Sequence, residues 1–193
     1  MKKDYSFSIL ILLASFIICT SSVLVLDQKS TKSIGDKLQY VNFAVGTIAA
    51  LKYNKISTLT IIYAEGVTLV HGIKFMGSVA KWEVCKRPDS EGKRSRFDGL
   101  PSGHTAFAWF AASFFRLFSN NYYISLPLYI SSIFTGFTRV YSGEHSFLQV
   151  FFGALFAEVL VITNQRFLID FNDKLTKKAK LIFFQVYSKI FAG

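Results

Sequence analysis

Cysteines and acidic residues are scarce in this chain, which also has no internal repeat and no low-complexity segment. Its two cysteines, Cys19 and Cys85, are too few for a disulfide framework or a cysteine-based zinc site. Asp and Glu number 12 against 22 Lys and Arg, which gives a formal net charge of +10. The basic residues flank apolar blocks instead of gathering in one polar region, so the charge does not indicate a nucleic-acid-binding protein. Anionic lipid is the partner that such a pattern favours.

What the chain has in abundance is apolar sequence, with 51% of its 193 residues of hydrophobic types and 21 phenylalanines. These residues form blocks about as long as a bilayer is thick, and charge borders each block. The first block is longer than the core of a signal peptide, and no clear small-x-small cleavage site follows it, so a membrane span is preferred. Residues 27–38 are expected to form a polar loop. The expected spans are residues 6–26, 40–53, 56–81, 104–119, 122–140 and 146–164.

The fold class that follows is all-α, a bundle of six transmembrane helices. The distribution of Lys and Arg places the N-terminus in the cytoplasm and the charged loop at 82–100 on the outer side. Residues 1–164 form the six-span domain, with a motif core at 56–164. The basic tail at 165–193 has apolar residues near helical spacing, which predicts an amphipathic helix on the inner leaflet.

Most of the remaining polar residues fall at one end of the expected bundle. In this topology the end of the third span, the start of the fourth, the end of the fifth and the start of the sixth all lie at the outer face. Four helix ends can therefore meet in one pocket. The residues concerned are Lys81, Arg87, Ser102, Gly103, His104, Arg139 and His145.

These residue types suit phosphoryl transfer. Cationic side chains bind a dianionic phosphate, and a helix start after Gly103 offers free N–H groups and a close backbone. The hydroxyl of Ser102 adds a donor. One of the two histidines, His104 and His145, can act as a nucleophile and the other as the proton donor to the leaving oxygen. A zinc site would need a third ligand, and none is obvious beside the two histidines, so the chemistry is expected to be independent of metal.

The motifs resemble those of the type 2 phosphatidic acid phosphatase superfamily, which comprises integral-membrane lipid phosphatases and related enzymes. That family carries Lys-x6-Arg-Pro, Pro-Ser-Gly-His and Ser-Arg-x5-His-x3-Asp. This chain has "KWEVCKRP" at 81–88, "PSGH" at 101–104 and "TRVYSGEHSFLQ" at 138–149. The middle motif matches in full, and the order and spacing of the three are similar to those of the family.

The resemblance implies a role for each matching residue. His145 would attack phosphorus, and His104 would protonate the leaving alkoxide of the lipid. Water would then hydrolyse the phosphohistidine, with no cofactor. The groups that the resemblance assigns to the phosphoryl oxygens are Lys81, Arg87, Ser102, Gly103 and Arg139.

Three positions depart from the family pattern. Lys81 precedes Arg87 by six positions instead of seven, which turns its direction on a helix by about 100°, so that Lys86 or Lys74 could take part of its role. Thr138 replaces a serine and keeps a hydroxyl. Gln149 stands where the family has Asp, and it can accept a hydrogen bond from the nucleophilic histidine without supplying charge. Loss of that charge in an analogous triad lowers the rate by orders of magnitude.

The sequence therefore predicts a membrane enzyme that hydrolyses a lipid phosphate monoester or diphosphate through a phosphohistidine. Two alternatives remain open: a phosphotransferase that uses the same site, and a catalytically silent protein that binds lipid phosphates. The expected location is a bacterial inner (plasma) membrane, with the site facing the periplasm or exterior. The expected partners are the lipid phosphate and the membrane, without nucleic acid, and the sequence gives no oligomeric state.

Overall fold

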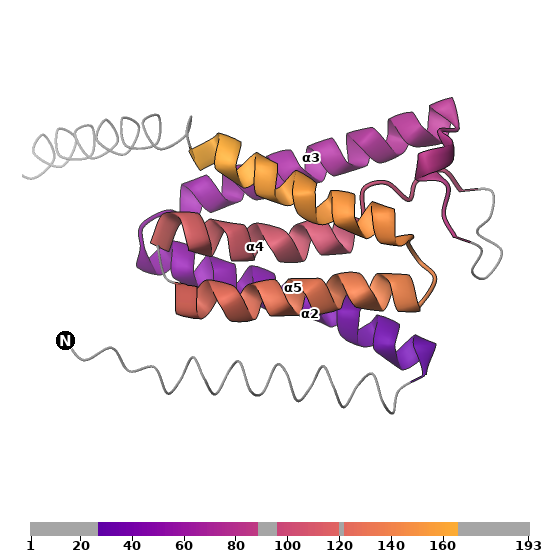
Figure 1. Ribbon diagram of the computed structural model, residues 1–193. Helices are drawn as coiled ribbons and strands as arrows, with labels where there is room; N and C mark the ends of the chain where they lie inside the picture. The colour runs from indigo at the N-terminus through magenta and orange to yellow at the C-terminus, as the bar shows by residue number, and fades with distance from the viewer. Residues whose placement is uncertain (1–26, 89–95, 120–121, 166–193) are drawn as a thin grey trace, which may run out of the picture.

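A computed structural model of the chain describes residues 27–88, 96–119 and 122–165. This part of the chain is all helical, without strands (Figure 1). The expected first span at 6–26 and the amphipathic tail at 165–193 lie outside it, apart from Gln165 itself, so they stay predictions together with the count of six spans. The described elements are α2 (Gln28–Lys52), α3 (Ile56–Ala80), the short 3₁₀ helix η1 (Glu83–Cys85), α4 (Gly103–Ser119), α5 (Tyr122–Tyr141) and a last helix, Phe147–Gln165.

The prediction of a polar loop at 27–38 is wrong, because this segment forms the first turns of α2. Asp27 caps the helix, and its Oδ1 accepts a hydrogen bond from the backbone N–H of Ser30 at 2.8 Å. Hydropathy alone divided one helix into a loop and a short span. The polar residues in its first turns are tolerated because several of them contact polar groups of other elements.

The first turns of α2 lie very close to the end of α5. A Cβ atom added to Gly35 would lie 2.6 Å from Nη2 of Arg139 and would also collide with the hydroxyl of Thr138. Only glycine fits at this crossing. The next residue of α2, Asp36, is thereby held against the end of α5.

One buried cluster lies mainly between α3, α4 and the last helix, where Phe110 and Phe114 of α4 are the largest fully buried apolar side chains. Gly66 of α3 leaves the space that the Phe110 ring occupies. Rings of Tyr63 and Phe110 meet edge to face, with centroids 5.4 Å apart. This packing fixes α3 against the start of α4, and it therefore places the residues at 101–104 relative to α3.

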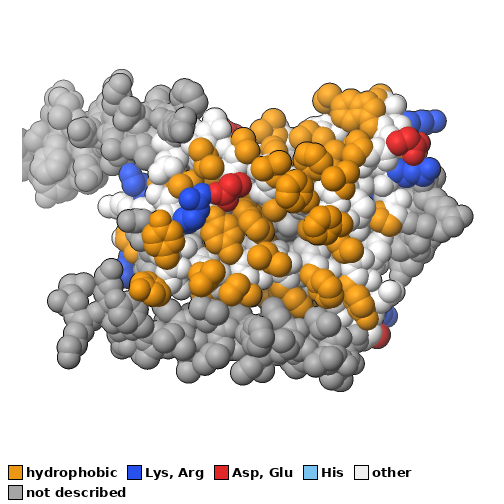
Figure 2. Space-filling model, in the orientation of Figure 1, with side chains coloured by type: hydrophobic (Ala, Val, Ile, Leu, Met, Phe, Trp, Pro, Cys, Tyr) orange, Lys and Arg blue, Asp and Glu red, His pale blue; other side chains and the backbone are white. Residues whose placement is uncertain are grey.

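Two of the described helices, α3 and Phe147–Gln165, are long and apolar enough to cross a membrane. Only 33% of the apolar window in α3 and 28% of that in the last helix is buried inside the protein. Apolar side chains therefore point outward, and Phe147 is 74% exposed. Hydrophobic side chains are spread over the face shown in Figure 2, with few charged side chains among them. The chain is associated with a membrane through these outward apolar surfaces.

Candidate active site

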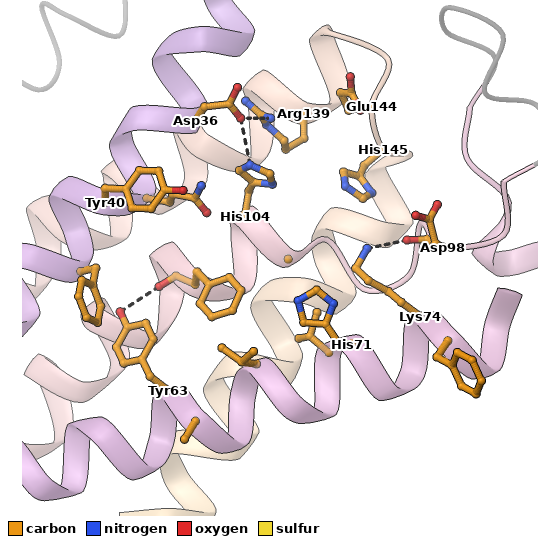
Figure 3. A pocket seen from close by; sticks show the side chains of 18 of the residues that line it. Asp36, Tyr40, Tyr63, His71, Lys74, Asp98, His104, Arg139, Glu144 and His145 are labelled. Atoms are coloured by element: carbon orange, nitrogen blue, oxygen red, sulfur yellow. Dashed lines mark hydrogen bonds and ion pairs between the residues drawn. The ribbon is translucent and has the colours of Figure 1, made fainter.

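One pocket of about 1340 Å³ opens between α2 and α3 and reaches the start of α4 and the end of α5 (Figure 3). Its polar end holds residues from four elements and two loops. Apolar and aromatic side chains of α2, α3 and α4 line the rest. The cationic and imidazole side chains at the polar end are Lys32, His71, Lys74, Arg87, Arg96, His104, Arg139 and His145.

His145 lies in the short loop between α5 and the last helix, and it is only 3% exposed. Its backbone N–H donates to the carbonyl oxygen of Arg139 at 3.1 Å, which fixes the loop against the end of α5. The Nδ1 atom of the ring lies 3.2 Å from Oε1 of Gln149, in the first turn of the last helix. This is the hydrogen bond that the sequence suggested for Gln149.

The other contacts of Gln149 fix how its amide is oriented. Its Nε2 donates to the carbonyl oxygens of Val84 at 3.1 Å and Lys86 at 2.8 Å. The opposite atom, Oε1, accepts from the backbone N–H of Ser146 at 3.2 Å. Because the donors of the amide are engaged elsewhere, Oε1 must accept from Nδ1 of His145. The proton of the neutral ring is thus on Nδ1, and Nε2 keeps the lone pair that a nucleophile needs.

The surroundings of His145 keep its ring neutral. Burial lowers the pKa of His145 to about 3, and the positive charges of Lys74 and Arg87 act in the same direction. A neutral imidazole is the form that can attack phosphorus. The same two cations suit a bound phosphate, so the charges that disfavour imidazolium favour the anionic substrate.

His104 occupies the first turn of α4, beside the pocket, and its side chain is 37% exposed. Its Nε2 lies 3.0 Å from Oδ1 of Asp36 on α2. Figure 3 shows the rings of His104 and His145 on the wall of the same pocket. The structure therefore brings together the two histidines that the sequence separates by 41 positions.

Arg139, at the end of α5, is 1% exposed and is held mainly by α2. Its Nη1 donates to Asp36 Oδ1 at 2.7 Å, and its Nη2 donates to the carbonyl oxygen of Lys32 at 2.6 Å. Its Nε donates to the hydroxyl of Thr138 at 3.3 Å, so the hydroxyl retained at that position contacts the guanidinium. Arg139 lines the pocket while its orientation is fixed from outside the motif.

Arg87 connects the two loops at the polar end of the pocket. Its Nε donates to Asp98 at 2.7 Å, and its Nη1 contacts the carbonyl and carboxylate oxygens of Glu144 at 3.1 and 3.3 Å. Burial would raise the pKa of Asp98, but hydrogen bonds and charge from Arg87 and Arg96 hold it at about 2. The carboxylate of Glu144 also accepts from Lys32 at 2.5 Å. Glu144 thus joins α2 to both loops through its contacts with Lys32 and Arg87.

Of the lysines considered in the first motif, Lys74 reaches the pocket and Lys81 does not. Helix α3 ends at Ala80, and Lys81 follows it in a left-handed conformation with φ 51°, exposed and outside the pocket lining. Lys74, about two turns earlier on α3, lines the pocket, and its Nζ donates to the carbonyl oxygen of Asp98 at 2.5 Å. Lys86 is exposed and does not line the pocket.

Before His104, the segment 101–103 contributes backbone to the pocket more than side chains. Ser102 is fully buried, and its hydroxyl accepts from Thr105 at 3.0 Å instead of facing the pocket. Gly103 lines the pocket, and a Cβ added there would meet nothing closer than Val70 Cγ1 at 3.7 Å. The glycine therefore leaves open space toward the pocket, where a ligand can approach the backbone.

Sequence reasoning missed Asp36 and Lys32, which belong to a segment expected to be a loop. Their spacing of four positions is the helical signal that could have placed them on one face of a helix. It also missed Asp98, which orients Arg87. Among the described residues, no three His, Cys, Asp or Glu side chains are grouped so that they could hold a metal ion.

Comparison with known proteins places these features in a class. A family model of the PAP2 superfamily matches residues 55–170, which include all three motifs and every described helix except α2. The chain belongs to the PAP2 superfamily. The lipid A 4'-phosphatase of Helicobacter pylori is 32% identical over 135 residues, or 65% of this chain and 65% of that protein. The chain thus spans less than two thirds of that relative's length. No solved structure matches the chain.

Proposed function

We propose that this protein is a membrane lipid phosphatase that cleaves a phosphate monoester or diphosphate through a phosphohistidine at His145. The observation that carries the proposal is the pocket itself. Its polar end holds the histidines His104 and His145 and five cationic side chains, three of which we assign to the phosphate, and an apolar groove continues from there between α2 and α3. The cations concerned are Lys74, Arg87 and Arg139.

The groove fits the lipid part of the substrate. Its walls carry side chains from facing helices, so an acyl or prenyl chain that lies there keeps contact with apolar groups while its phosphate reaches the histidines. The outward apolar faces of α3 and the last helix support a groove that lies at membrane depth. The apolar and aromatic residues that line it are Tyr40, Phe43, Ile56, Leu59, Tyr63, Ala64, Val67, Val70, Phe75 and Phe107.

In the first step, the lone pair on Nε2 of His145 forms a bond to phosphorus. The bond between phosphorus and the lipid oxygen breaks, its electron pair stays on that oxygen, and His104 supplies the proton. The hydrogen bond from Nδ1 to Gln149 persists as the ring becomes positively charged. Lys74, Arg87 and the backbone at Gly103 would hold the other phosphoryl oxygens.

In the second step, water attacks the phosphohistidine and releases inorganic phosphate. His104, which has lost its proton, takes one from the water, so the site returns to its starting state. Every step uses side chains of this chain, so we propose a reaction that is independent of metal. An acceptor lipid in place of water would make the same site a phosphotransferase.

Phosphates of lipid A are the substrates to test first, because the Helicobacter pylori relative is named as a lipid A 4'-phosphatase. A bacterial inner membrane with the pocket at the periplasmic face would give the site access to such lipids. Undecaprenyl diphosphate, phosphatidylglycerophosphate and phosphatidic acid complete the panel, since each joins a phosphate to a lipid chain.

The test is phosphate release by the purified protein in detergent with a chelator present. Wild type is expected to release phosphate from at least one lipid of the panel, and His145→Ala is expected to lose that activity. His71→Ala changes the third histidine, on the pocket wall, and is expected to raise KM and leave kcat near wild type. Binding without release would identify a silent binder and contradict the proposal, and transfer of the phosphate to an added lipid would identify a phosphotransferase.

A further inference from the structure

One carboxylate outside the three motifs contacts two functional groups of the site. Oδ1 of Asp36 lies 3.0 Å from Nε2 of His104 and 2.7 Å from Nη1 of Arg139 (Figure 3). Asp36 belongs to α2, which precedes the residues 55–170 matched by the family model. Neither the motifs nor the comparisons therefore assign it a role.

The position of Asp36 is fixed by the helix that carries it. The preceding residue, Gly35, lies against Arg139 so closely that a Cβ atom would not fit. The carbonyl oxygen of Lys32, one turn earlier, accepts from Arg139 at 2.6 Å, and the Lys32 ammonium binds Glu144 at 2.5 Å. Asp36 is thus held by contacts on several sides of α2.

Charges around His104 make this carboxylate important for the proton that the ring must carry. Burial of the His104 ring and the nearby charges of Arg139 and Lys74 disfavour a positive charge on it. Two described carboxylates, Asp36 and Glu144, oppose them. Glu144 binds Lys32 and Arg87, so Asp36 is the one in direct contact with the ring.

We propose that Asp36 is a positioning residue for His104: its carboxylate orients the ring and stabilises its protonated form for transfer of a proton to the leaving oxygen. This inference rests on the proposed function. It places a carboxylate beside the proton donor, whereas the nucleophile His145 has the neutral partner Gln149. The side chain of Asp36 is 41% exposed, so an entering lipid phosphate can reach both Asp36 and His104.

The chemistry gives a direct way to separate this role from a structural one. When the bond between phosphorus and an alkyl oxygen breaks, the alkoxide needs a proton from His104. A nitrophenyl oxygen leaves as a stable anion and needs none. Loss of Asp36 should therefore slow the cleavage of an alkyl phosphate much more than that of an aryl phosphate.

The experiment compares wild type, Asp36→Asn and Asp27→Asn in detergent. Asn keeps the shape of Asp36 and can accept the same hydrogen bonds, so only the charge is removed. Asp27→Asn removes a carboxylate from the cap of the same helix, away from the pocket, and Asn is also a good capping residue. The substrates are p-nitrophenyl phosphate and whichever monoester, lipid A or phosphatidic acid, wild type cleaves faster.

For Asp36→Asn, kcat/KM on the lipid monoester, which reports the steps up to departure of the leaving group, is expected to fall about 10-fold or more, because general acid catalysis contributes at least that much. Its kcat/KM on p-nitrophenyl phosphate should stay within about threefold of wild type, while Asp27→Asn and the melting temperatures stay unchanged. Equal losses on both substrates, or no loss on either, would overturn the inference and leave the proposed function standing. A wild type inactive on all phosphates would overturn both.

Discussion

Oε1 of Gln149 lies 3.2 Å from Nδ1 of His145, while Nε2 of the same amide donates to the carbonyl oxygens of Val84 and Lys86. One neutral side chain thus orients the proposed nucleophile and fastens the loop after α3. A carboxylate at this position could accept from His145, but it could not donate to the two carbonyls. Gln149, which replaces the Asp of the family pattern, is therefore suited to the acceptors that surround it.

We expect Gln149→Glu, which keeps the shape of the side chain, to be less active and less stable than wild type. Two part-buried carbonyl oxygens would lose their donors and face a negative charge, at a cost of up to about 1–3 kcal/mol for each lost partner. Phosphate release and thermal unfolding in detergent measure the two effects. Gln28→Glu, at the exposed start of α2, is the matched control. Activity of Gln149→Glu above wild type would show that the missing charge, and not the amide, limits the enzyme.

The stability of the protein should fall in acid because of His145. Its pKa is about 3 in the folded protein, against an ordinary value of about 6.5, so the unfolded chain takes up this proton first. The stability linked to the neutral ring is fully present above about pH 6.5 and is lost as pH falls toward 3. Between pH 7 and pH 5 the loss is about 2 kcal/mol. Denaturant unfolding of wild type and His145→Gln at both pH values measures it, and parallel losses in the two proteins would contradict the assignment.

Lys74 and Lys81 should differ sharply on substitution. Lys74→Ala removes a charged donor from the pocket and should lower kcat/KM by about ten- to a hundredfold, the usual effect of a hydrogen bond to a charged group. Lys81→Ala changes an exposed residue just after α3 and should stay within about twofold of wild type, as expected for a surface side chain. Steady-state kinetics on a lipid phosphate compare the two. A larger effect at Lys81 would show that the first motif acts through that residue.

The groove between α2 and α3 can be blocked from α3. Ala64 lines the pocket, and Ala64→Trp should reduce the cleavage of lipid phosphates about 10-fold or more, because the indole would displace an acyl or prenyl chain. Cleavage of p-nitrophenyl phosphate, which has no lipid chain, should remain. Leu69→Trp places the same side chain on an exposed part of α3 outside the pocket and serves as the control. Equal loss on both substrates would argue that the lipid chain binds elsewhere.

The bounds of α3, α4, α5 and the last helix follow the expected spans closely, because each is a long apolar block between charged or turn residues. Their motifs also identified several of the residues that line the pocket, among them His104, Arg139 and His145, since residues at the ends of neighbouring helices lie close in a bundle. Hydropathy failed at α2, whose first turns are polar because they face the site. A hydropathy criterion for membrane spans lowers the score of a helix for every polar residue, including those that point into a pocket.

Contacts between side chains of different helices and loops could not be predicted from the sequence. The spacing of the first motif suggested only that Lys81 points in an unexpected direction. The structure shows that α3 ends before Lys81 and that Lys74, earlier on the same helix, lines the pocket. Pairing of Asp36 with His104 depends on the close crossing of α2 and α5 at Gly35, which no local pattern shows. The expected first span and the tail, which lie outside the described residues, stay predictions.

The covalent intermediate tests the central claim most directly. Wild type would be mixed with a lipid phosphate labelled in its phosphorus, quenched after a short reaction, and analysed for label on the protein. We predict label on wild type that is stable in alkali and lost in acid, as expected for phosphohistidine, and that maps to residue 145. His145→Ala should carry none. Phosphate release by wild type with no protein-bound label, or label that persists in His145→Ala, would contradict the account.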